Sequence, residues 1–238
     1  MKAVIVIPTY NESDNIAELI NDIGKLHIDC DILVVDDSSP DGTAHIVREI
    51  AERNPRVHVM IRSHDKGRGY AGRDGFIKAI KMQPEFIIEM DADFSHNPKY
   101  IPSLLRECIH ADVVIGSRAV PNGKEIGRGI ARQVVTKCAQ IIIRVLLNVP
   151  VRDCTSGYRC FKRSVLERIG VDSLISSGPS IVEEVLLRCS HIGVTFKEIP
   201  IIFEDRKKGQ SNLTPIKLLH TLWMIIIFRF GGKSKNVS

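Results

Sequence analysis

The chain has 238 residues, with 33 Lys or Arg against 28 Asp or Glu, which gives a formal net charge of +5 at pH 7. This length suits one large α/β domain with a sizeable core, and the composition is that of an ordinary globular protein without low-complexity segments. The modest positive charge fits an anionic substrate, an anionic lipid surface, or solubility alone. Six cysteines lack C-x-x-C spacing, which argues against a zinc ribbon and a disulfide scaffold. We expect reduced, mostly buried thiols, as in a cytosolic protein.

The first half of the sequence alternates strand-like and helix-like segments. It opens with the apolar run 3–7 instead of a basic region and a longer apolar block, so no signal peptide is predicted. Further strands are expected at 32–35, 57–61, 86–90 and 113–115, with helices at 16–23, near 44–53 and after Gly72. This alternation predicts parallel βαβ units in a doubly wound α/β sheet, with the carboxyl ends of the parallel strands along one edge.

The pattern changes after Arg118. The segments expected beyond it are a loop (121–129), an apolar helix (130–147), a turn-rich stretch (to Phe161), a helix (182–189), a strand (195–203), a basic loop (204–212) and a last helix from Pro215. No linker is long enough to separate two domains. We therefore expect one domain over 1–212, followed by an amphipathic tail over 213–238.

Two carboxylates, Asp91 and Asp93, directly follow the apolar run 86–88. If that run is a buried strand, the pair lies at its carboxyl end, where ligands bind in open α/β sheets. Two hard oxygen donors suit Mg²⁺ or Mn²⁺, completed by water and a substrate diphosphate. The alternative is a solvated turn, because Asp favours turns for its own reasons.

A G-x-G-x-x-G sequence occurs at 67–72, after an expected strand and before a helix. This pattern is typical of dinucleotide binding, but it normally follows the first strand. Here it follows the third, and Glu89, in the ribose-binding position, lies within the strand before Asp91. A flexible loop near the substrate, with Lys66 and Arg68 available to an anion, accounts for these glycines better.

Two further polar residues are expected at the same edge of the sheet. Asp37 follows the second strand and could accept hydrogen bonds from a nucleobase or ribose, whereas Tyr10 is equally suited to packing or to stacking on a base.

Four segments occur in fixed order along the chain: 6–12, 34–43, 90–96 and 116–118. Together they closely resemble family 2 glycosyltransferases with a GT-A fold, and specifically the dolichol- or polyprenol-phosphate mannosyltransferases. Later matches extend the resemblance to about Leu213: Arg132 with Thr136, 156–159, Glu184, 198–201 and 205–211.

The resemblance implies a GT-A nucleotide-diphospho-sugar transferase fold and inverting, metal-dependent transfer of a hexose to dolichyl or polyprenyl phosphate. The residues implied to bind the sugar nucleotide are Pro8, Tyr10, Glu12, Val35, Asp37, Asp91, Ala92, Asp93 and Arg206. Asp91 and Asp93 would also hold the Mg²⁺ or Mn²⁺ ion. The residues implied at the acceptor phosphate are Arg118, Arg132 and Thr136.

Two departures from the family pattern concern the donor. Asn212 stands where the late loop often has Lys, and Ile181 with Val182 stands where an aromatic residue and Gln are expected. GDP-mannose is the expected donor, with UDP-glucose or another sugar nucleotide as the alternative. A transferase acting on a different acceptor would need a catalytic carboxylate, for which Glu183 and Glu184 are candidates.

A lipid acceptor implies contact with a membrane surface. The longest uncharged apolar run, 218–228, is shorter than the ~20 residues of a membrane span. Basic residues such as Lys217 and Arg229, beside the aromatic residues Trp223 and Phe230, are typical of an interfacial helix. Alternatively, this run packs into the core or binds a small membrane subunit. We therefore expect a cytoplasmic enzyme, peripheral on the cytosolic face of a membrane. Nucleic-acid binding is not expected, because the basic residues form no stripe interleaved with aromatic residues.

Overall fold

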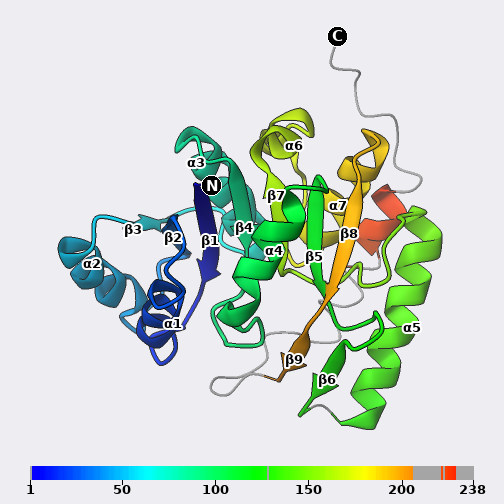
Figure 1. Cartoon of the computed structure of the whole chain (residues 1–238), viewed down its shortest axis with the longest axis horizontal. Helices are drawn as coiled ribbons and strands as arrows, with labels where there is room; N and C mark the ends of the chain where they lie inside the picture. The colour runs from blue at the N-terminus through cyan, green and yellow to red at the C-terminus, as the bar shows by residue number, and fades with distance from the viewer. Residues whose placement is uncertain (1, 128, 206–220, 222, 229–238) are drawn as a thin grey trace.

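The structure is a computed structural model that describes residues 2–127, 129–205, 221 and 223–228, with only the backbone of 130–135. Its centre is a seven-stranded sheet in the order β3-β2-β1-β4-β7-β5-β8, accompanied by a two-stranded sheet of β6 and β9 (Figure 1). The strands are β1 (Ala3–Thr9), β2 (Cys30–Asp36), β3 (Val57–Ile61), β4 (Phe86–Glu89), β5 (Val113–Ser117), β6 (Lys124–Ile126), β7 (Arg159–Lys162), β8 (Phe196–Pro200) and β9 (Ile202–Glu204). Neighbouring strands of the large sheet are parallel except at β7, which is antiparallel to β4 and β5.

Helices cover both faces of the large sheet. They are α1 (Ile16–Gly24), α2 (Thr43–Arg53), α3 (Arg68–Lys81), α4 (Ile101–Cys108), α5 (Ile130–Leu147), α6 (Arg163–Arg168) and α7 (Ile181–His191), with short turns η1 (Pro98–Tyr100) and η2 (Val171–Ser173). One buried cluster packs α1, α2 and α4 against the sheet, and a second packs α3, α5, α6 and α7. In β1, Val4 and Val6 join the second cluster while Ile5 and Ile7 join the first, because side chains alternate along a strand. The predicted mainly parallel sheet flanked by helices is confirmed.

Helix α3 lies unusually close to the sheet. A Cβ atom at Gly75 would lie 2.6 Å from Val6 Cγ1 and 3.1 Å from Val35 Cγ2, so a larger residue would push the helix outward. The helix begins at Arg68, so the prediction of a flexible loop over 67–72 is wrong for every residue after Gly67. Gly69 instead allows contact with another loop, because a Cβ there would lie 2.1 Å from the carbonyl oxygen of Ser176.

Several other elements differ from the prediction. Strand β7 lies at the end of the stretch expected to be turn-rich, and helix α6 follows it directly. Neither was predicted, and helix α4 was not predicted either. The strand expected over 195–203 is two strands, because β8 ends at Pro200, which has no N–H for a ladder. Residues 202–204 then pair with β6, which lies inside the loop expected at 121–129.

The described part of the C-terminal segment, 221 and 223–228, is helical. Ile225 is fully buried in the cluster that contains Ile143 and Leu147 of α5, whereas Trp223 is 60% exposed. Most of the tail predicted over 213–238 lies outside the described residues. Within the described part, every helix is too short or too polar to cross a bilayer.

Candidate active site

The carboxyl ends of the parallel strands bring several loops to one edge of the sheet. Strand register places Thr9 beside Asp36, and Val6 beside Glu89. Strand β7 runs in the opposite direction, so its first residue, Arg159, pairs with Glu89 at the same edge. The loops that follow β1, β2, β4 and β5 therefore meet near the start of β7, where open α/β sheets bind ligands.

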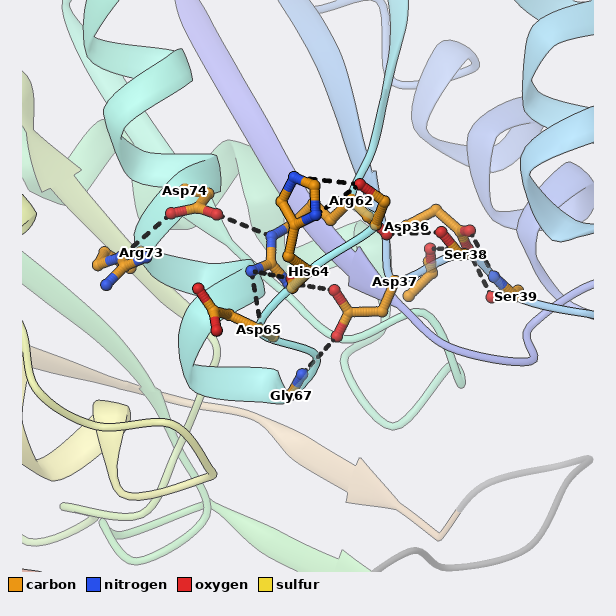
Figure 2. A network of polar contacts seen from close by, with 12 residues as sticks. Asp36, Asp37, Ser38, Ser39, Arg62, His64, Asp65, Gly67, Arg73 and Asp74 are labelled. Carbon is orange, nitrogen blue, oxygen red and sulfur yellow. Dashed lines mark hydrogen bonds and ion pairs between the residues drawn. The ribbon is translucent and has the colours of Figure 1, made fainter.

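Asp37, predicted to bind a nucleotide, lies after β2 in the polar network of Figure 2. The buried guanidinium of Arg62 donates to one carboxylate oxygen of Asp37, and the backbone N–H of Gly67 donates to the other at 2.7 Å. Arg62 also donates to Asp74 at 2.8 Å and to the carbonyl of Asp65 at 3.0 Å. The Asp37 carboxylate is therefore held in one orientation between β2 and the start of α3.

Side-chain bonds join the loops after β1 and β2. Thr9 Oγ1 donates to Asp36 Oδ1 at 2.9 Å, and the Ser39 N–H donates to Asp36 Oδ2 at 2.8 Å. The Asn11 N–H in turn donates to Ser39 Oγ at 3.0 Å. Between these anchors Tyr10 is 46% exposed, so its ring has a free surface on which a base could stack.

The other residues predicted on the nucleotide side differ in accessibility. Val35 is fully buried and packs against Gly75, which leaves its backbone for any contact with a nucleotide. Pro8 is also buried. Glu12 is anchored locally, since one of its carboxylate oxygens accepts the Asn15 amide at 2.8 Å.

The predicted metal ligands occupy the loop after β4. The Asp91 side chain is 40% exposed, whereas Asp93 is nearly buried and accepts the Ser95 hydroxyl at 2.6 Å and the Ser95 N–H at 3.1 Å. The Asp91 N–H donates to His96 Nδ1 at 3.0 Å, and Ala92 between the two acids is buried. The loop therefore presents one open carboxylate and one enclosed carboxylate.

Phe94 shows that this loop is not a loosely solvated turn. Its φ of 63° lies in the left-handed region, which is costly for a bulky side chain. Its side chain is 8% exposed and belongs to the core cluster with α1 and α4. Burial of the ring thus holds a strained backbone next to Asp93, as is typical of functional loops.

A chain of alternating charges leads from the core to Asp91. Arg159 Nη2 donates to Glu89 at 2.5 Å, and both side chains are fully buried. Arg68 Nη2 donates to the other Glu89 oxygen at 2.7 Å and reaches Asp91 Oδ1 at 3.4 Å. Burial opposes ionisation of Glu89, yet the guanidinium groups of Arg159 and Arg68 hold its pKa below the ordinary value. The expectation that Arg68 is available to an anion is therefore wrong.

Arg118, predicted at the acceptor phosphate, is held by the loop before β7. Its backbone N–H donates to Asp153 at 3.1 Å, and its Nη2 donates to Thr155 Oγ1 at 3.0 Å. Gln140 of α5 donates to the same Asp153 at 2.8 Å. The Arg118 guanidinium also lies over the Phe203 ring, 4.4 Å from its centroid.

Aromatic rings connect Asp91 to Arg118. The buried His96 ring stacks on Tyr158 with centroids 5.0 Å apart, and it meets Phe203 edge-on at 6.0 Å. Burial lowers the pKa of His96, so the ring is neutral near pH 7 and its Nδ1 can accept the Asp91 N–H. The predicted nucleotide site at Asp91 and the predicted acceptor site at Arg118 therefore share one wall of aromatic rings.

Three predicted site residues are placed only in part. Thr136 lies half-buried in α5. Arg132 lies in the same helix, but its side chain is outside the described residues, and so is Arg206 altogether. Their roles remain predictions.

Comparison with known families then identifies the chain. The model of glycosyl transferase family 2 matches residues 4–170, which is more than half of the sequence. The chain belongs to glycosyltransferase family 2. The predicted family resemblance is thus confirmed.

Two curated relatives of this glycosyltransferase align over most of its length. An undecaprenyl-phosphate mannosyltransferase of Micrococcus luteus is 34% identical over 214 residues, which cover 90% of this chain and 88% of the relative. A polyprenol monophosphomannose synthase of Mycolicibacterium smegmatis is 35% identical over 237 residues, covering 98% and 88%. Both are glycosyltransferases by name, as predicted for this chain.

Solved structures of other glycosyltransferases share the fold. Glucosyl-3-phosphoglycerate synthase of Mycobacterium tuberculosis, solved with Mn²⁺, UDP and glucosyl-3-phosphoglycerate, superposes with a TM-score of 0.65 at 18% identity, covering 98% of this chain and 81% of that one. Mannosyl-3-phosphoglycerate synthase of Rubrobacter xylanophilus gives 0.64 at 16% identity, covering 100% and 77%. At these identities the likeness establishes the GT-A fold alone, which was the predicted fold.

The residues around Asp91 fit a divalent cation of the kind predicted. Within the described ranges, no three His, Cys, Asp or Glu side chains are grouped to hold a metal ion by themselves. Magnesium, however, is commonly bound through one or two carboxylates, with waters and substrate phosphates completing the shell. The hard carboxylates of Asp91 and Asp93 in one rigid loop match that arrangement, with Asp91 open to solvent.

Sequence reasoning missed several residues of this glycosyltransferase site. Arg62, Asp153 and Phe203 carry no local motif, and their roles arise from contacts distant in sequence. His96 and Arg159 lie inside matched segments, which was the available signal for them.

Proposed function

We propose that this glycosyltransferase transfers mannose from GDP-mannose to a polyprenyl or dolichyl phosphate, with inversion at the sugar. The names and the coverage of the two curated relatives support this acceptor class. The observation that carries the proposal is the ring of Phe203, which contacts both His96, beside Asp91, and Arg118. A phosphate bound at Arg118 would lie next to a sugar nucleotide bound at Asp91.

The acceptor side relies on arginines. Arg118, held by Thr155, and Arg132 of α5 would bind the acceptor phosphate, because guanidinium groups match phosphate oxygens bidentately. Thr136 would lie near that phosphate. A phosphate monoester has a second pKa of about 6, so this nucleophile is already ionised near neutral pH and needs no strong base. Positioning of the two substrates would then supply most of the acceleration.

The candidate catalytic carboxylates for a hydroxyl acceptor are engaged or enclosed. Glu184 accepts the N–H groups of Ile175 at 3.0 Å and Ser176 at 2.9 Å, and it pairs with Arg188 at 2.8 Å. Glu183 is buried, and burial raises its pKa to about 7. Neither is placed as an open general base, which favours a phosphate acceptor over a sugar or protein hydroxyl.

The donor side would use the loops after β1, β2 and β4. Tyr10 would stack on the base and Asp37 would accept hydrogen bonds from the nucleoside, with Pro8, Glu12, Val35 and Ala92 lining the nucleotide. Asp91 and Asp93 would hold Mg²⁺ or Mn²⁺, which as a Lewis acid neutralises charge on the departing nucleoside diphosphate. Arg206 would close over the diphosphate.

Membrane contact would bring the enzyme to its lipid acceptor. The exposed apolar residues Ile141 and Val145 of α5, at 63% and 73% exposure, lie on one helical stripe, and Trp223 is 60% exposed. We place this surface against the cytosolic face of a membrane, with the tail over 213–238 as an interfacial segment. A small membrane subunit covering the same surface is the alternative.

A second candidate function keeps the reaction type and changes the substrates. The solved structures include a neighbour bound to Mn²⁺ and UDP, so UDP-glucose or another sugar nucleotide is the alternative donor. Ile181 and Val182, where the family resemblance leads us to expect an aromatic residue and Gln, motivate this alternative. A different acceptor would be expected together with this donor only if Arg118 and Arg132 do not bind an acceptor phosphate.

The direct test is a transfer assay with defined substrates. Purified protein is incubated with labelled GDP-mannose or UDP-glucose, Mg²⁺ or Mn²⁺, and polyprenyl phosphate in detergent, and label in the organic phase is measured. Polyprenol without phosphate serves as the matched acceptor control. We expect organic-phase label from GDP-mannose with polyprenyl phosphate and background with polyprenol.

Other outcomes change the proposal in defined ways. Product from UDP-glucose alone would replace the donor and keep the acceptor. Label on an added sugar or protein acceptor, with none on polyprenyl phosphate, would overturn the proposed function.

A further inference from the structure

The charges that lead to Asp91 are balanced without any metal ion. Arg159 and Arg68 contribute two positive charges, and Glu89 and Asp91 contribute two negative ones, in an alternating row. Glu89 is fully buried between the two arginines, with ion-pair distances of 2.5 Å and 2.7 Å. Asp91 therefore already has a cationic neighbour on the protein side of its carboxylate.

The geometry makes Arg68 a fixed cation rather than a flexible ligand. It is the first residue of α3, and its side chain is 23% exposed. Its Nη1 is buried and has no hydrogen-bond acceptor among the described residues. A Cβ at the neighbouring Gly72 would lie 2.9 Å from this nitrogen and 3.5 Å from Glu89 Oε1, so the space around the pair is closed.

The contact of Arg68 with Asp91 is weaker than its contact with Glu89. Its Nη2 lies 3.4 Å from Asp91 Oδ1 but 2.7 Å from Glu89 Oε1, and hydrogen bonds near the longer distance are weak. Arg68 thus does little to orient Asp91. Its main effect there is electrostatic, because a positive charge beside a carboxylate repels a second cation.

Building on the proposed function, we infer that Arg68 weakens divalent cation binding at Asp91 and Asp93 until a nucleoside diphosphate is present, so that cation and donor bind together. The phosphates bring the negative charge and the oxygen ligands that the balanced row lacks. In this role Arg68 contacts no reacting atom, and its positive charge acts on the cation from beside Asp91. Binding of either ligand then favours the other, as reciprocal coupling requires.

Cation binding can be measured without any turnover. Mn²⁺ is titrated into the full-length protein and free Mn²⁺ is followed by its EPR signal, first alone and then with saturating GDP or UDP. For the wild type we expect weak binding of Mn²⁺ alone and clearly tighter binding with the nucleotide. Arg68→Leu should bind Mn²⁺ alone roughly tenfold more tightly, the size of a Coulomb term between such charges in a largely aqueous site.

Two companion variants test the sign of the effect. Arg68→Lys keeps the positive charge and should leave the Mn²⁺ affinity near that of the wild type. Glu89→Gln removes the opposing charge and should weaken binding of Mn²⁺ alone. In the double variant, Arg68→Leu should again tighten Mn²⁺ binding relative to Glu89→Gln alone, and this comparison also serves if the single Arg68→Leu protein does not fold.

A distant arginine controls for net charge. Arg56→Leu removes an exposed guanidinium paired with Asp29 and should not change Mn²⁺ binding. With saturating nucleotide, the gain from Arg68→Leu should fall to less than about threefold, because the negative charge of the diphosphate offsets the positive charge of Arg68.

The results separate this inference from the proposed function. If the wild type binds Mn²⁺ with nucleotide but Arg68→Leu binds Mn²⁺ alone no more tightly, the role given to Arg68 is overturned. If Mn²⁺ binding is undetectable with either nucleotide, or is unchanged in Asp91→Ala, the proposed metal site itself fails.

Discussion

At the scale of single residues, the site depends on charged groups that sequence reasoning could place only in part. Asp37, Asp91 and Asp93 were predictable because each follows an apolar strand at the carboxyl edge of the sheet. The partners that orient them were not. Arg62 is 25 residues from Asp37, and Arg68 is 21 residues from Glu89, so only the folded register brings these pairs together.

Glu183 provides a residue-scale prediction about stability. Burial raises its pKa from 4.5 to about 7, and one of its carboxylate oxygens has no partner among the described residues. In the unfolded chain Glu183 ionises near pH 4.5, while in the folded protein it keeps its proton. The folded protein therefore loses stability as pH rises from about 4.5 to 7. Below that window Glu183 contributes no penalty, and above it the penalty is constant.

Replacing Glu183 by Gln should remove this pH dependence. The variant should gain stability relative to the wild type between those pH values, by about 1.4 kcal/mol for each unit of pKa shift. Urea unfolding of both proteins at pH 4.5, 6 and 7.5 measures the difference. A difference that stays constant with pH would show that Glu183 is not protonated in the folded protein.

At the scale of elements, the apolar pattern predicted β1, β2, β3, β4 and α1 because their buried residues follow simple periods. It failed where tertiary packing decides. Strand β7 is four residues long, starts with the fully buried Arg159, and is antiparallel between β4 and β5. No local period indicates such a strand. Helix α3 also begins inside a glycine-rich segment that reads as a loop.

Gly69 supplies the prediction at this scale. A Cβ there would lie 2.1 Å from the Ser176 carbonyl oxygen and 2.6 Å from the Ser177 carbonyl carbon, both backbone atoms. Gly69→Ala should therefore displace the loop against α3 and destabilise the protein by about 2 kcal/mol. In a protein of this size, that corresponds to a fall in Tm of roughly 4–8 °C.

A glycine with open space at its Cβ position is the matched control for this substitution. Gly24, at the end of α1, has no atom of the described residues within 4 Å of a Cβ position. Gly24→Ala should leave the Tm unchanged or slightly raised, because alanine favours the helix. An equal Tm for Gly69→Ala and wild type would mean that the loop at Ser176 does not pack on α3.

At the scale of the whole molecule, the family 2 fold joins the proposed donor half on β1, β2 and β4 to the proposed acceptor half on β5 and the loop before β7. His96, Tyr158 and Phe203 form the wall between the halves. This arrangement is expected to bring an ionised lipid phosphate to a sugar nucleotide whose diphosphate is neutralised by a cation at Asp91 and Asp93.

The most direct measurement is the amount of labelled polyprenyl-phosphate sugar formed by the wild type and by Asp93→Asn during a titration with Mn²⁺. Asn keeps the size of Asp93 and an oxygen that can accept from Ser95, so the Tm should change little. We expect cation-dependent product from the wild type, abolished by EDTA, and about 100-fold less from the variant at every Mn²⁺ concentration. Equal product from the two proteins, or undiminished wild-type product in EDTA, would contradict the account.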